Sequence, residues 1–123
     1  MGNFTNLTKT LYSYFNSFGV SAYLDNSAPT GATFPYITYT LNYEDGYIDN
    51  LIQVRIWTKS TSLVQLTTLV DKIGDNVNNG ITINGADGGT IWIKKGSPFA
   101  QFIPEEDLTL KVAYLTLTTN ILF

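Results

Sequence analysis

The 123-residue sequence contains no cysteine and no histidine. Without cysteine the chain has no disulfides and no thiolate metal ligands, so its fold must be held together by packing alone. Without histidine it lacks the commonest general base, and the two absences together remove most catalytic triads and most zinc sites. We therefore expect no enzyme activity, no catalytic residue, no cofactor and no bound metal.

Charge is also scarce. Charged side chains make up 14% of the residues, the net charge is −3, and Arg55 is the single arginine. Proteins that bind nucleic acids through phosphates carry clustered lysines and arginines, whereas the one adjacent basic pair here is Lys94–Lys95. We expect no direct nucleic-acid recognition. A surface this poor in charge is typical of a chain covered by protein partners, although an ordinary compositional bias would produce it too.

Long apolar runs are missing as well. A membrane-spanning helix needs roughly 20 consecutive apolar residues, and no segment approaches that length. The opening residues, MGNFTNLTKTL, lack the basic head and apolar block of a secretion signal. We expect no membrane association and a cytosolic location by default. The length and the 44% of hydrophobic residues predict one domain over residues 1–123.

Two segments carry apolar residues at helical spacing. The first covers residues 4–18 and ends before Gly19, a typical helix stop. The second follows Ser62-Leu63-Val64-Gln65, which has the form of a capping box. We expect both apolar stripes to cover one sheet face, and they comprise Phe4, Leu7, Leu11, Phe15 and Phe18 in the first helix and Leu63, Leu66, Val70, Ile73 and Val77 in the second.

Segments rich in β-branched and aromatic residues predict the strands. They cover residues 20–24, 34–43, 47–58, 81–83, 90–94 and 108–118. Residues 96–107 are predicted to form a loop. The order α-β-β-β-α-β-β-β predicts an α+β fold, with a mainly antiparallel β-sheet and two amphipathic helices packed on one face.

Carboxylates are the main remaining candidates for chemistry. Glu105-Glu106-Asp107 is the densest acidic cluster, but adjacent acids usually splay apart, which favours a solvated loop. The segment Asn84–Gly89 lacks the alternating oxygen ligands and closing glutamate of a calcium loop, and a β-hairpin tip explains its glycines. Neither feature predicts a metal or catalytic site.

The pattern points instead to contacts with other chains. Arg55 and Trp57 place a guanidinium and an aromatic ring on the polar face of a strand, and both residue types are enriched at interface centres. The hairpin tip and the loop 96–107 are typical of segments that order on a neighbour, and long sheet edges are expected to pair. Trp57 packing against its own chain is the alternative. The candidate interface residues are Arg55, Trp57, Asn84, Gly85, Asp87, Phe99, Phe102 and Ile103.

Three runs of residues carry a family resemblance. They are Phe34-Pro35-Tyr36-Ile37-Thr38-Tyr39-Thr40-Leu41, Ile52-Gln53-Val54-Arg55-Ile56-Trp57-Thr58-Lys59-Ser60 and Leu69-Val70-Asp71-Lys72-Ile73. With the length and the element order, they resemble the tail-terminator or tail-completion (minor tail) proteins of long-tailed bacteriophages and prophages. Thr58 stands where relatives often have aspartate.

The resemblance implies a structural virion protein that forms a hexameric ring, caps the tail tube, ends tail growth and supplies the head-docking face. Its implied partners are further copies of itself, the tail tube protein and a head-completion or connector protein. Its implied location is the head-proximal end of the virion tail, with the host cytoplasm during assembly. Two alternatives stay open: a phage head–tail connector or neck protein, and a non-enzymatic cytosolic module that binds a ligand or protein through the Arg55–Trp57 face.

Overall fold

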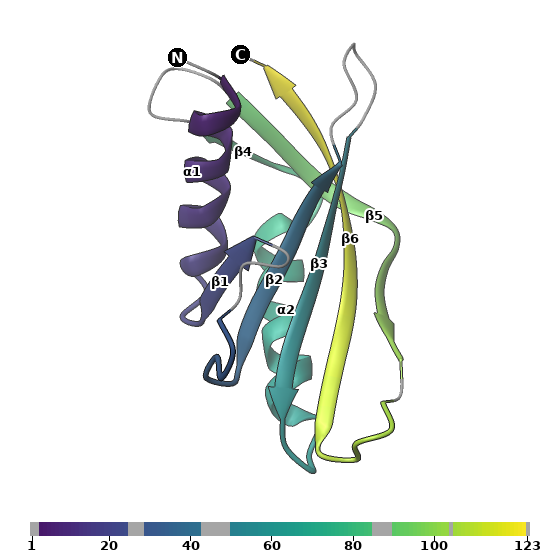
Figure 1. Cartoon of the computed structure of the whole chain (residues 1–123). Helices are drawn as coiled ribbons and strands as arrows, with labels where there is room; N and C mark the ends of the chain where they lie inside the picture. The colour runs from purple at the N-terminus through teal and green to yellow at the C-terminus, as the bar shows by residue number, and fades with distance from the viewer. Residues whose placement is uncertain (1–2, 25–28, 43–49, 85–89, 104, 123) are drawn as a thin grey trace.

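The computed structural model describes residues 3–24, 29–42, 50–84, 90–103 and 105–122. In these residues two helices and six strands follow one another in the order predicted from the sequence, which confirms the α+β class (Figure 1). The elements are α1 (Asn3–Asn16), β1 (Ser21–Leu24), β2 (Tyr36–Asn42), β3 (Asn50–Lys59), α2 (Val64–Val77), β4 (Ile81–Asn84), β5 (Thr90–Phe102) and β6 (Leu110–Leu122).

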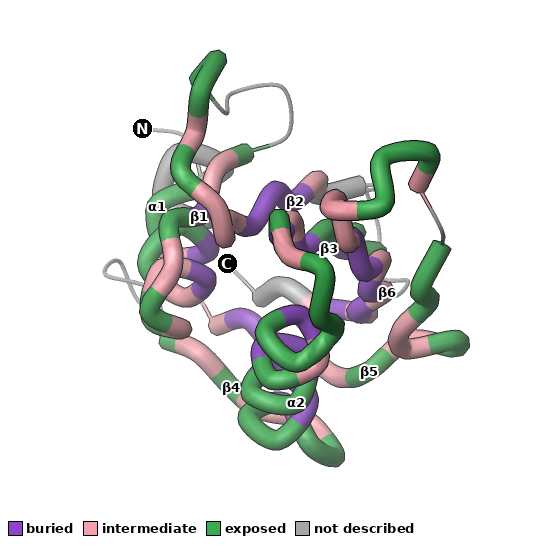
Figure 2. The backbone as a smooth tube through the Cα atoms, turned by 90° about the horizontal axis from the view of Figure 1, so that it is seen from below, coloured by how far each residue is buried: buried purple, intermediate pink, exposed green. Residues whose placement is uncertain are grey.

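The strands form one sheet in the order β1-β2-β3-β6-β5-β4. The β1–β2 pair is parallel and the other pairs are antiparallel. The long central strands β3 and β6 pair from Asn50↔Thr119 to Lys59↔Leu110. Seen end-on, the strands form an arc with α2 inside it and α1 beside β1 (Figure 2). The sheet therefore has an inner face that holds the core and an outer face that carries Arg55 and Trp57.

The core lies between the inner face and the two helices. Along β3, Ile52, Val54 and Ile56 are buried while the residues between them are exposed or half-buried, as alternation on a sheet with one covered face requires. Tyr14 on α1 donates a hydrogen bond to Asn76 Oδ1 on α2 at 2.7 Å, which joins the helices. The buried hydrophobic side chains of the helices, among the described residues, are Leu11 and Phe15 of α1 and Leu66, Leu69, Val70, Ile73 and Val77 of α2. The side chains of Phe4 and Leu7 lie outside the described part of the structure.

The start of α2 differs from the prediction. The helix begins at Val64, and Leu63 at the N-cap makes no side-chain capping bond. Ser62 Oγ accepts a hydrogen bond from the Val64 amide at 3.1 Å. The prediction that Leu63 belongs to the core stripe is wrong: its side chain is 51% exposed, because it precedes the first turn of the helix.

The prediction of a loop over residues 96–107 is also wrong in its first half. Strand β5 continues to Phe102 and pairs with β6 again from Ala100↔Leu115, after a register shift between Lys95 and Ala100. Gly96, Ser97 and Pro98 have the composition of a turn, but here they lie in an irregular stretch of the strand, as β-bulge residues do. The last strand likewise starts later and runs further than the predicted 108–118.

Gly96→Ala is expected to lower the free energy of unfolding by about 1–3 kcal/mol, the usual cost of overpacking. A Cβ at this position would lie 2.7 Å from Thr116 Cγ2 and 2.8 Å from the Thr116 backbone oxygen, and a backbone atom does not give way easily. Urea denaturation measures the effect. Ser97→Ala is the control, since Ser97 is exposed on the same stretch and its loss should cost under about 0.5 kcal/mol. Equal stability of the two variants would contradict this packing.

In the described residues the sheet edges are partly open: β4 pairs with β5 only over Thr90–Ile93, so the later part of β5, as far as Phe102, has β6 as its one partner strand. The outermost strands β1 and β4 have four residues each, and short edge strands are one way in which proteins limit edge-to-edge pairing. On β1, the Ala22 amide donates a hydrogen bond to Asn16 Oδ1 at 3.1 Å, so a side chain of α1 satisfies this backbone donor. The later part of β5 therefore stays a candidate for pairing with another chain, beside contacts made by side chains.

Candidate interaction surface

On the outer face, the two residues singled out from the sequence have different surroundings. The Trp57 ring stacks on Tyr36 at 5.9 Å between ring centroids and 11° between planes. Its Nε1–H donates to Thr38 Oγ1 at 2.9 Å. Trp57 is thus half-buried against its own sheet, with its polar atom satisfied. Arg55 is exposed, and its guanidinium carbon lies 5.5 Å from the centre of the Tyr114 ring.

A second group of side chains gathers where the start of α2, the end of β5 and the start of β6 meet. Of the eight large hydrophobic residues that are exposed in the described part of the chain, five lie here. We call this group the apolar end surface, and it consists of Leu63, Val64, Phe102, Ile103 and Leu108. Leu108 is the most exposed of them, at 78%.

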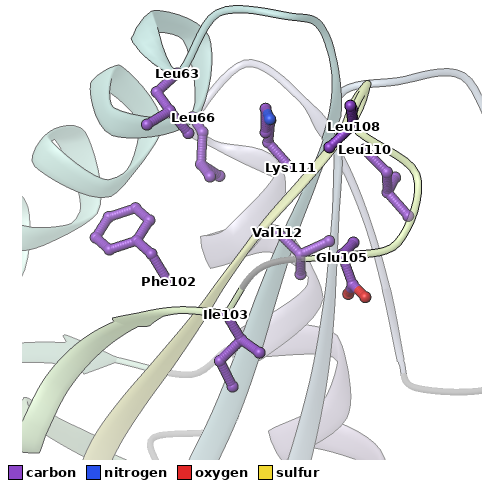
Figure 3. A pocket seen from close by; sticks show the side chains of 9 residues that line it. All are labelled: Leu63, Leu66, Phe102, Ile103, Glu105, Leu108, Leu110, Lys111 and Val112. Atoms are coloured by element: carbon purple, nitrogen blue, oxygen red, sulfur yellow. The ribbon is translucent and has the colours of Figure 1, made fainter.

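Figure 3 shows how four of these side chains, all but that of Val64, line a shallow pocket of about 230 Å³. Leu63 and Leu66 approach from α2, Phe102 and Ile103 from the end of β5, and Leu108 from the segment before β6. Monomeric soluble proteins rarely leave large apolar side chains clustered in water without a functional reason. This end of the molecule is therefore the strongest candidate for contact with a partner.

Acidic residues border the apolar end surface. Glu106 and Asp107 are exposed, and Glu105 lines the pocket opposite Lys111. Asp107 Oδ1 accepts hydrogen bonds from the hydroxyl and amide of Thr109, at 2.7 and 2.9 Å, and these bonds hold the pKa of the Asp107 carboxyl below its usual value. Asp107 thus stabilises the turn into β6. Among the residues that the structure describes, no group of three or more acids, histidines or cysteines is placed to hold a metal ion.

A different surface lies at the β1 edge of the sheet, where α1 packs beside β1. It carries the exposed side chains of Tyr12 and Leu24 and a broader hollow of about 520 Å³. Lys9, Tyr23 and the edge of the buried Tyr39 also line this hollow. We call it the α1–β1 surface. Of the described residues that line it, Lys9 is the charged one.

The structure separates the residues that the sequence singled out. Phe102 and Ile103 belong to the apolar end surface, where they line one pocket with Leu63 and Leu108, although the sequence pattern predicts a helix at Leu63 and a strand at Leu108. Arg55 and Trp57 lie on the outer face, and Asn84 is exposed at the end of β4.

Phe99 does not fit the prediction of a loop residue free to contact a neighbour. It is half-buried and packs against the core because β5 continues through it, with its ring beside Gly74 of α2. The predicted contacts of Gly85 and Asp87 fall outside the residues that the structure describes.

In the described part of the chain, neither helix has the length and apolarity needed to cross a membrane. No family model matches the sequence, and comparisons with curated proteins and with solved structures find no match.

Proposed function

We propose that this chain is a structural phage virion protein that caps the tail tube as a ring, ends tail growth and supplies the head-docking face. The observation that carries the proposal is the apolar end surface. Five large apolar side chains at one end of a small domain lose contact with water only when another protein covers them. The three sequence runs that resemble tail terminators indicate which kind of assembly provides that cover.

The presence of two different patches on the same chain also supports a ring of identical chains. A ring forms when one patch on each copy binds a different patch on the next copy. The apolar end surface and the α1–β1 surface are two such patches, and they differ in residues and charge. The resemblance to tail terminators implies a hexameric ring. In such a ring the partners of the chain are its own copies, the tail tube protein and a head-completion protein.

The alternative of a ligand-binding module on the Arg55–Trp57 face is less well supported. The Trp57 ring already stacks on Tyr36, and its N–H is already bonded to Thr38. A ligand would have to compete with these contacts. Arg55 and Trp57 therefore stay predictions for a protein contact on the outer face.

Tails assembled without this chain test the proposal. We expect tube lengths to become uncontrolled in negative-stain images, because no ring stops tube growth, and we expect the wild-type gene supplied in trans to restore a single length. Free tails of normal length in the absence of the chain would contradict a terminator role and would favour a head–tail connector instead.

A further inference from the structure

We infer that the apolar end surface of one copy binds the α1–β1 surface of the next copy, with Leu108 entering the hollow beside Tyr12. This inference names the copy-to-copy contact of the proposed ring, and to that extent it rests on the proposed function. The contact itself can be measured with the chain alone as well as on tail tubes.

The shapes of the two surfaces favour this pairing. Leu108 is 78% exposed and Val64 is 69% exposed, so the apolar end surface projects side chains into solvent. The α1–β1 surface has the larger hollow, about 520 Å³ against about 230 Å³, and its lining is mostly aromatic and aliphatic. A projecting leucine in an aromatic-lined hollow buries apolar area on both chains, and this is the main favourable term in association.

Charge favours the same pairing. Glu105, Glu106 and Asp107 directly precede Leu108 in the chain, and Glu105 also lines the end pocket. Lys59 and Lys111 lie near Asp107, but the three acids outnumber these two lysines. Among the residues that the structure describes, Lys9 is the charged residue that lines the α1–β1 hollow. Insertion of Leu108 therefore brings an acidic rim towards a lysine, and such complementarity orients partners and suppresses wrong pairings.

Pairing of like surfaces is disfavoured by the same charges. Two apolar end surfaces facing each other would bring two acidic rims together, and two α1–β1 surfaces would bring Lys9 near its own copy. Like-charge contacts of this kind cost free energy. The unlike pairing is also the one that repeats from copy to copy, since an open assembly keeps one unused patch of each kind at its two ends until a ring closes.

Thiol cross-linking tests the contact directly, because the chain has no cysteine of its own. Leu108→Cys and Tyr12→Cys each place a thiol at an exposed position. The two variants, carrying tags of different size, are mixed in equal amounts with a short bismaleimide, both in solution and on tail tubes. We expect the mixed dimer to exceed its statistical share of the products. Thr82→Cys, exposed on β4, replaces Tyr12→Cys in the control mixture and should give no such excess.

A charge exchange strengthens the test. Lys9→Glu added to the Tyr12→Cys chain is expected to reduce the yield of mixed dimer, and Glu106→Lys added to the Leu108→Cys chain is expected to restore it. A statistical share of mixed dimer both in solution and on tubes would overturn the inference.

The outcomes separate this contact from the proposed function. Capped tubes without excess mixed dimer would support the proposed function and contradict the proposed contact. Excess mixed dimer would support the proposed contact. If tails also had normal length in the absence of the chain, that result would contradict the proposed function.

Discussion

Phe15→Ala is expected to lower the free energy of unfolding by about 3–5 kcal/mol, the usual cost of truncating a buried phenylalanine. The Phe15 side chain is 0% exposed. Its ring centroid lies 4.7 Å from that of Tyr39 on β2 and 5.2 Å from that of Tyr14 on the same helix. The truncation would leave a cavity between α1 and the sheet, where the surroundings relax only in part.

Thermal unfolding followed by circular dichroism measures the loss. For a domain of this size we expect the melting temperature to fall by roughly 10–20 °C. Ser13→Ala is the matched control, since Ser13 is exposed on the same helix and its loss should change stability by less than about 0.5 kcal/mol. A melting temperature of Phe15→Ala equal to that of the control would contradict the packing of α1 on the inner face.

Leu108→Asp is expected to abolish capping of tail tubes while the chain stays folded. In the proposed contact the new carboxylate would replace an apolar side chain inside an aromatic-lined hollow, beside an acidic rim that already faces Lys9, and burying that charge would cost several kcal/mol. Since 1.4 kcal/mol changes an equilibrium constant tenfold, affinity should fall about a hundredfold or more. The Leu108 side chain is 78% exposed in the single chain, so the melting temperature should not change.

Thr82→Asp provides the comparison for this variant. It adds the same charge at an exposed position on β4, away from both proposed surfaces, and should leave capping at the wild-type level. Electron microscopy of tube ends, with the fraction of capped ends counted for each variant, measures the difference. Normal capping by folded Leu108→Asp would show that the apolar end surface is not used in the assembly.

The element order and most of the core were predictable because each depends on local periodicity. On β3, Ile52, Val54 and Ile56 alternate with polar residues, and a strand with one buried face displays that alternation directly in its sequence. On α1, Leu11 and Phe15 fall one helical turn apart and both are buried. The order of strands in the sheet, with β6 between β3 and β5, has no such local signal.

The apolar end surface could not be predicted for the same reason. It unites the start of α2 with the end of β5 and the segment before β6, which lie far along the sequence from α2 and reach it because the sheet curls around this helix (Figure 2). Leu63 fits the helical stripe by its spacing from Leu66, but it lies before the first turn and faces solvent. The composition of Gly96–Pro98 is typical of a turn and predicts a loop for the second half of β5, with Phe99 at the surface. The strand instead continues after an irregular stretch, and Phe99 packs against the core.

The most direct test of the proposed assembly adds the purified chain to purified tail tubes of the phage or prophage in which the proposed function would place it. The tube end itself acts as the template, so the test holds even if the isolated chain is monomeric. We predict that several copies bind as a ring at one end of each tube and that these tubes no longer elongate when more tube protein is supplied. Tubes that stay bare at both ends, or that elongate at the same rate with and without the chain, would contradict the account.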